Sequence, residues 1–165
     1  MLWVGALLVL WTVFGSASGS CCGQTSAETL ALRWLEDMRA TQPTVELVLP
    51  PQVHLGDTVA VTLRLRNDGS QPLDLELPGR PVAFDVIILR PDGAEVWRRL
   101  RNMVTGSALM LLRLKPGEVR EFTAQWAQVD NDGRRVAPGS YSVRGVLLVQ
   151  KSRLTTAARQ LVIAR

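Results

Sequence analysis

From Val45 to the end of the chain, apolar and polar side chains alternate with a period of two. The clearest stretch is VAVTLRLR at 59–66, in which four aliphatic side chains are separated by alanine, threonine and arginine. Successive side chains of a β-strand point to opposite faces of a sheet. The pattern therefore predicts strands with one face in a dry interior and the other in water.

Turn sequences such as Asn67-Asp68-Gly69 and Pro91-Asp92-Gly93 separate these stretches. We expect strands at 45–49, 59–66, 73–77, 82–89, 95–100, 109–114, 119–126, 140–149 and 159–164. The run 82–89 is densely apolar, which is typical of a strand covered on both faces. No helical periodicity interrupts the series, so residues 44–165 are predicted to form an all-β, antiparallel immunoglobulin-like β-sandwich. Trp97 and Trp126 are expected to fill its core.

The amino-terminal segment has a different character. An apolar run from Leu2 to Phe14 is followed by small residues from Gly15 to Ser20, and no Lys or Arg precedes the run. The run is too short to span a bilayer, so residues 1–20 are interpreted as a signal peptide, and an extracytoplasmic location, secreted or at the cell envelope, is expected. Residues 21–43 are expected to hold an amphipathic helix and a linker.

Cys21 and Cys22 are the two cysteines of the chain. Because they are neighbours, a disulfide between them would close almost no loop and would not staple the fold. The segment Ser18-Gly19-Ser20-Cys21 is similar to a bacterial lipobox, although Ser18 stands where that pattern usually has Leu. Two alternatives stay open: lipidation at Cys21, or a plain leader. Membrane contact is expected only through this leader or lipid anchor.

The basic residues do not indicate nucleic-acid binding. The net charge is +4, and Lys115 and Lys151 are the lysines, so 17 of the 19 basic residues are arginine. These arginines alternate with apolar residues instead of clustering on one helix, which is typical of solvated sheet faces.

Residues suited to catalysis or metal binding are sparse. The chain has a single histidine, His54, and no Gly-x-Ser-x-Gly motif that would supply a serine nucleophile for it. The tetrad Asp130-Asn131-Asp132-Gly133 lacks the glutamate that completes a calcium loop. That tetrad is instead predicted to be a polar hairpin connection. We therefore expect a non-enzymatic binding protein without a metal or cofactor.

Several short motifs occur in an ordered series between 45 and 149. They are the strand at 61–67 that ends in Asn67, Pro72-Leu73, Phe84-Asp85-Val86, the PDGAEVW segment at 91–97, the LKPGE segment at 114–118, Trp126, and the VAPGSY segment at 136–141. This order resembles the BsuPI family, the intracellular proteinase inhibitor domain. The resemblance implies that the chain inhibits a serine proteinase, and hence that its partner is a protein. The segment 98–108 departs from the family in lacking an aromatic-rich stretch.

An inhibitor needs an exposed loop that is held extended, so that its conformational entropy is already removed when it enters a protease cleft. The segment 99–106 is the candidate, because it lies between two expected strands and contains Arg99, Arg101 and Met103, whose side chains can fill a specificity pocket. The alternative is that 99–106 is an ordinary connection. In that case, the domain is an immunoglobulin-like envelope interaction or structural module without inhibitory activity.

Overall fold

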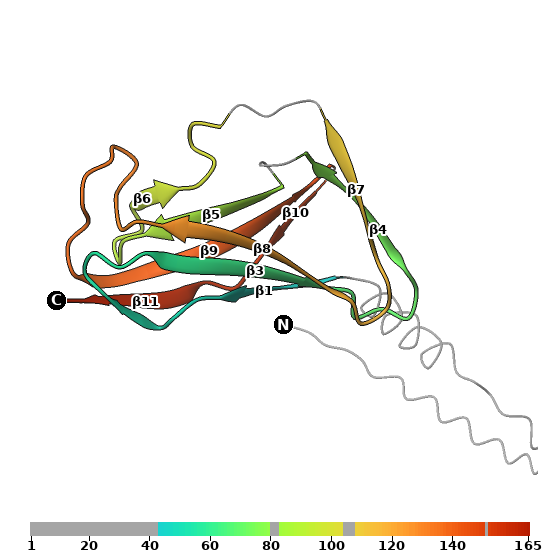
Figure 1. Ribbon diagram of the computed structural model, residues 1–165, viewed down its shortest axis with the longest axis horizontal. Coiled ribbons are helices and arrows are strands. Elements are labelled where there is room, and N and C mark those ends of the chain that lie inside the picture. Colours follow the sequence, from blue (N-terminus) through green and yellow to red (C-terminus); the bar gives the residue numbers. More distant parts are fainter. Residues whose placement is uncertain (1–42, 80–82, 104–107, 151) are drawn as a thin grey trace, which may run out of the picture.

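The computed structural model describes residues 43–79, 83–103, 108–150 and 152–165 (Figure 1). These residues form strands, turns and connections, so the predicted all-β fold is confirmed. The expected leader at 1–20, the lipidation candidate Cys21 and the helix expected within 21–43 lie outside the described residues. Within the described ranges, no helix is long and apolar enough to cross a bilayer.

Within the described residues, eleven strands form three sheets, two of which face each other (Figure 1). The first sheet has the order β1-β3-β8, and the second has the order β2-β11-β9-β5-β6, with β10 also paired to β9. A third sheet, β4-β7, stands at one end of the molecule. The bounds are β1 Thr44–Val48, β2 Gln52–His54, β3 Val59–Arg66, β4 Leu73–Pro78, β5 Phe84–Leu89, β6 Glu95–Arg98, β7 Leu109–Leu114, β8 Val119–Trp126, β9 Gly139–Val149, β10 Ser152–Thr155 and β11 Arg159–Ala164.

The core lies between the first and second sheets and is continued by the inner face of β4 and β7. Alternate residues of β3, which are Val59, Val61, Leu63 and Leu65, are fully buried, as the alternation predicts. Trp126 is buried at the end of β8, and its ring lies 6.4 Å from that of the half-buried Trp97. These two tryptophans join the first sheet to β6, which confirms their expected place in the core.

The two facing sheets pack closely at Gly145 in β9. A Cβ atom at this position would lie 2.8 Å from Leu63 Cδ1 and 3.0 Å from Leu47 Cδ1, both in the first sheet. It would also lie 3.3 Å from Cγ2 of Thr156, which directly follows β10 and whose hydroxyl accepts the Gly145 N–H. The spacing between the sheets therefore depends on the missing side chain.

One strand pair departs from the predicted antiparallel arrangement. β2 pairs with β11 in parallel, with Gln52 opposite Val162. The prolines Pro50 and Pro51 end the pairing of the preceding strand, because they cannot donate to a ladder, and the chain then passes from the first sheet to the second. The sequence analysis predicted neither β2 nor β10, since strands of three or four residues carry too little periodicity to detect.

Asn67 connects the third sheet to the first. Its side-chain amide donates to the carbonyl oxygens of Gln71 and Leu114, at 2.9 and 3.0 Å, and its Oδ1 accepts the Gly69 N–H. Its own carbonyl accepts the N–H of Gly117, which has a φ of +76° in the turn before β8. This buried amide therefore fixes two turns at once.

We predict that Gly145→Ala destabilises the protein by about 1–3 kcal/mol, because an added methyl group overpacks this close contact. Denaturant unfolding would measure the loss. Leu63→Val gives the added methyl group more room. The double variant should therefore lose less free energy of unfolding than the sum of the two single-variant losses. Strict additivity would contradict the close contact.

Candidate functional site

The segment after β6 is folded into two consecutive turns. The N–H of Arg101 donates to the carbonyl of Arg98, and the N–H of Met103 donates to that of Leu100, each at 3.2 Å. The N–H of Arg99 also donates to Val86 O at 3.0 Å. The base of the segment is thus held against β5. The expectation of an extended loop is wrong for its described part, because these hydrogen bonds turn the chain.

A buried carboxylate holds this base in place. The Asp85 side chain is 2% exposed, and its Oδ2 accepts a hydrogen bond from Arg98 Nε at 2.6 Å. Its Oδ1 accepts the N–H of Leu100 at 3.1 Å, which is the second anchor of the same segment. The hydrogen bond to Asp85 raises the pKa of the Arg98 guanidinium above its usual value. One acid in β5 therefore fixes both the last side chain of β6 and the backbone that follows.

Of the three candidate residues in the segment, Arg99 lies inward. Its guanidinium carbon lies 4.1 Å from the centre of the Phe84 ring, and its Nη1 donates to Phe84 O at 2.6 Å. Burial lowers the pKa of Arg99, an effect that the nearby Asp85 charge partly opposes. The Arg99 side chain thus packs the segment onto β5, and the neighbouring side chains are the ones accessible to a partner.

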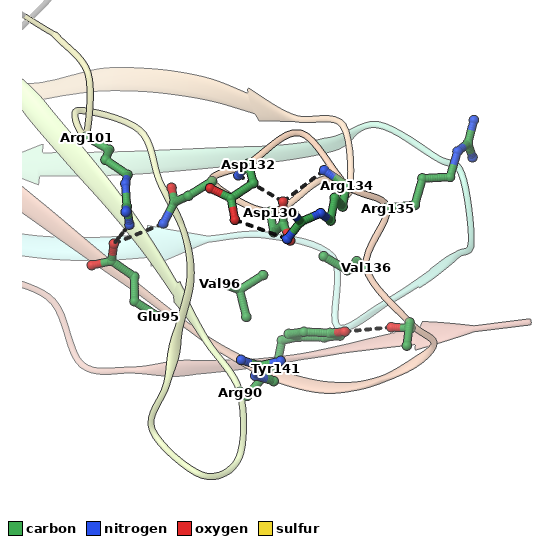
Figure 2. A pocket seen from close by; sticks show the side chains of 12 residues that line it. Arg90, Glu95, Val96, Arg101, Asp130, Asp132, Arg134, Arg135, Val136 and Tyr141 are labelled. Carbon is green, nitrogen blue, oxygen red and sulfur yellow. Dashed lines mark hydrogen bonds and ion pairs between the residues drawn. The ribbon is translucent and has the colours of Figure 1, made fainter.

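Arg101 and Met103 lie outward. The Arg101 side chain is 53% exposed and Met103 is 41% exposed. Arg101 Nη1 lies 3.5 Å from Glu95 Oε1 (Figure 2). Such an exposed ion pair contributes about 0–1 kcal/mol and exchanges readily for another carboxylate. The structure therefore separates the three predicted residues into one that packs inward and two that a partner can reach.

A pocket of about 430 Å³ lies beside Arg101 (Figure 2). One wall comes from β6 and the segment after it, and the other comes from the connection between β8 and β9. Four cationic and three acidic side chains line it, with Tyr141 among the rest. The charged lining residues are Arg90, Arg101, Arg134, Arg135, Glu95, Asp130 and Asp132.

The β8–β9 connection is attached to the edge of β6 through Asn131. The Asn131 N–H donates to Val96 O at 2.9 Å, and its Oδ1 accepts the Arg98 N–H at 2.9 Å. Its Nδ2 also donates to Glu95 Oε1, the atom that lies near Arg101. Asn131 thus occupies the place of a further strand beside β6 and holds the pocket closed on that side.

The connection contains a rigid turn, as the Asp-Asn-Asp-Gly sequence predicts. It is not the predicted hairpin connection, because β8 and β9 belong to different sheets and do not pair. Asp130 Oδ1 accepts the N–H groups of Asp132 and Arg134, at 2.9 and 2.8 Å, and Gly133 has a φ of +80°. Within the described residues, no group of three or more His, Cys, Asp or Glu side chains is placed to hold a metal ion. The Asp130 carboxylate binds the backbone of the turn, and Asp132 Oδ2 accepts Arg134 Nη1 at 3.3 Å.

Tyr141 forms the floor of the pocket and also belongs to the core. Its hydroxyl donates to Ala137 O at 2.6 Å, and its ring meets that of Trp126 edge-on at 6.0 Å. Burial raises the pKa of the Tyr141 phenol, and the charge of Arg90 partly opposes this rise. The pocket can therefore accept a hydrogen-bonding or charged group above a firm aromatic base.

Asp85 and Asn131 were not among the residues that the sequence analysis selected for the site. A signal for Asp85 was present, since it is a lone carboxylate within the densely apolar run 82–89, and an acid in a strand covered on both faces needs a partner. No comparable signal marked Asn131, because its role arises from contact with β6, which lies 33 residues away.

We predict that Asp85→Ala lowers the free energy of unfolding by about 2–4 kcal/mol, because it leaves Arg98 and the Leu100 N–H without their acceptor. Glu121→Ala is the matched control. Glu121 accepts Arg64 Nε at 2.7 Å, but both side chains are about half exposed, so its loss should cost less than about 1 kcal/mol. Equal losses in denaturant unfolding would contradict the anchoring role of Asp85.

We also predict a loss of stability in alkaline solution from Tyr141. Because its pKa is raised in the folded state, its contribution is fully present below about pH 10, where the unfolded chain begins to ionise, and is lost as the pH rises through the folded-state pKa. Tyr141 is the single tyrosine, so phenolate absorbance reports its titration directly. The stability difference between the protein and Tyr141→Phe should shrink over this range, and a constant difference would contradict the prediction.

Solved structures with some likeness to this chain serve varied purposes. The latent PorU of Porphyromonas gingivalis is 17% identical with a TM-score of 0.42, over 74% of this chain and 9% of that one. The sporulation control protein Spo0M of Bacillus subtilis is 15% identical with a TM-score of 0.43, over 74% of this chain and 49% of that one. A CARDB domain from Pyrococcus furiosus is 13% identical with a TM-score of 0.39, over 74% of this chain and 88% of that one. These likenesses carry no functional argument.

The comparison with curated proteins finds no match. A family model described as an intracellular proteinase inhibitor, BsuPI, matches residues 47–152. That description contradicts the extracytoplasmic location expected from the amino terminus, and the prediction of export is corrected accordingly. The leader interpretation depended on an apolar run with no basic residue before it, so its physical support was incomplete. Since the match extends over more than half of the sequence, the chain belongs to the BsuPI family of intracellular proteinase inhibitors.

Proposed function

We propose that this protein inhibits a serine proteinase and that Arg101 and Met103, in the segment after β6, enter the protease cleft. The observation that carries the proposal is the Asp85 anchor. Asp85 binds both the Arg98 side chain and the Leu100 N–H, while Arg101 and Met103 remain exposed just beyond them. Anchoring lowers the entropy that the segment loses when it binds, which favours a tight complex.

The chemistry of Arg101 selects among proteases. Specificity pockets of the trypsin type carry a carboxylate that pairs with a basic side chain. The pair of Arg101 with Glu95 is exposed and weak, whereas a hydrogen bond to a desolvated carboxylate contributes about 1.5–3 kcal/mol. The complex is therefore favoured when Arg101 leaves Glu95 and pairs with the protease carboxylate. Met103 adds an unbranched apolar side chain, which adapts to a neighbouring subsite.

The measurement is the inhibition constant of the purified protein against trypsin-like and subtilisin-like proteases. We predict that Arg101→Ala weakens inhibition of a trypsin-like protease by at least about tenfold, and that adding Met103→Ala weakens it further. Arg101→Lys should retain most of the inhibition, because it keeps the charge. All variants should unfold at the same temperature as the unchanged protein.

Arg135→Ala is the matched control. It removes an arginine that also lines the pocket but whose side chain points away from it (Figure 2). Inhibition should be unchanged in this variant. Equal losses for Arg101→Ala and Arg135→Ala would reject the assignment of the loop, and absence of inhibition across both protease classes would reject the inhibitory function.

A second candidate function is that of an immunoglobulin-like interaction module, and one observation favours it. Leu109 and Leu111, on the outer face of β7, are 53% and 77% exposed, and apolar side chains grouped in this way often mark a protein-binding surface. The hydrogen bond from the Tyr141 hydroxyl to Ala137 O, four residues upstream, resembles the tyrosine corner of immunoglobulin-like sandwiches. Leu111→Lys would abolish partner binding by this surface and leave protease inhibition intact.

A further inference from the structure

The outer faces of the two main sheets differ in how their arginines are paired. On the first sheet, Arg64 Nε lies 2.7 Å from Glu121, and Arg66 Nε lies 2.8 Å from Asp68. A face whose charges neutralise one another in this way is typical of a surface that meets only solvent. The paired arginines of the first sheet are therefore the reference for the arginines on the outer face of the second sheet.

The outer face of the second sheet has an excess of positive charge. Arg144 on β9 and Arg153 on β10 are both exposed, and neither guanidinium group has a hydrogen bond or ion pair with any residue that the structure describes. The acids on this face are already engaged, because Asp85 binds Arg98 and Glu95 lies near both Arg98 and Arg101. Arg144 and Arg153 are thus left to bind an anion from another molecule.

These two arginines line a hollow of about 410 Å³ on that face. Its apolar lining consists of Ile87, Val146, Leu148 and Leu100, of which Val146 lies between Arg144 and Leu148 along β9. A hollow with cationic side chains at its sides and aliphatic side chains between them suits a ligand that carries both carboxylates and apolar groups.

The strand register sets the distance between the two charges. Arg153 lies opposite Leu148, which is four residues beyond Arg144 on β9. Four residues of a strand extend about 13 Å, and one step to the next strand adds about 5 Å across. An extended peptide repeats its side chains on one face every second residue, so carboxylates at positions i and i+4 match this spacing, with residue i+2 above Val146.

We propose that the outer face of the second sheet binds an extended acidic segment of a protein partner, with one carboxylate on Arg144 and another, four residues away, on Arg153. The apolar lining and the presence of two unpaired arginines favour a peptide over a polynucleotide, which relies on a longer series of phosphate contacts. The surface involves neither Arg101 nor Met103 as an anchor, so it goes beyond the proposed inhibition.

The probe is the synthetic peptide Glu-Thr-Val-Thr-Glu with blocked ends, titrated into the isotope-labelled protein at low ionic strength and followed by NMR. Chemical-shift changes should concentrate on β9 and β10 and on the Nε–H signals of Arg144 and Arg153. Arg144→Gln and Arg153→Gln should each weaken binding by about fivefold, and added salt should weaken it further. Arg64→Gln, on the opposite face, is the matched control and should leave binding unchanged.

Three outcomes would overturn the proposal. The first is a peptide with both glutamates changed to glutamine that binds equally well. The second is shift changes scattered over the surface, with the same loss in Arg64→Gln. The third is a ten-nucleotide oligothymidine that binds more tightly than the peptide and loses affinity in the same two arginine variants. Each readout is binding, so failure here is distinguishable from failure of protease inhibition.

Discussion

The two facing sheets meet where β9 has no side chain. At Gly145, the side chains of Leu47 and Leu63 reach the backbone of the opposite sheet, and Thr156, just after β10, contacts the same position. Cys21 and Cys22 are the only cysteines and precede the sandwich, so its sheets are held together without a disulfide, mainly by apolar burial. The close approach at Gly145 sets the spacing that brings Trp126, Trp97 and Tyr141 into contact at the other end of the core.

The functional segment depends on that packing through one buried charge. Asp85 lies in β5, whose pairing with β9 holds it in the second sheet, and from there it binds Arg98 and the Leu100 N–H. Removing a buried carboxylate from water is unfavourable unless it is fully bonded, so its partners are held in one arrangement. The position of the segment after β6 is thus decided by a residue that is itself buried.

Family membership and geometry support two separate surfaces on one small protein. The segment that carries Arg101 and Met103 is anchored at its base and exposed beyond it, as expected for a member of a proteinase-inhibitor family. The face that carries Arg144 and Arg153 lies on β9 and β10. The ion pair between Glu95 and Arg101 adjoins both hollows, so the two surfaces are neighbours that share an edge.

The alternation of side chains was sufficient to predict most of the strands and the core. It located 109–114 and 119–126 as the structure has them, because burial of every second residue is a local property of a strand. The parallel pairing of β2 with β11, the attachment of Asn131 to β6 and the role of Asp85 were decided by the tertiary structure. Each joins residues that are distant in the sequence or depends on what covers a face, and neither kind of contact leaves a periodic pattern in the chain. The sequence by itself determined which side chains are buried and also which family the chain resembles, whereas only the fold decided that Arg99 packs inward while Arg101 and Met103 are exposed.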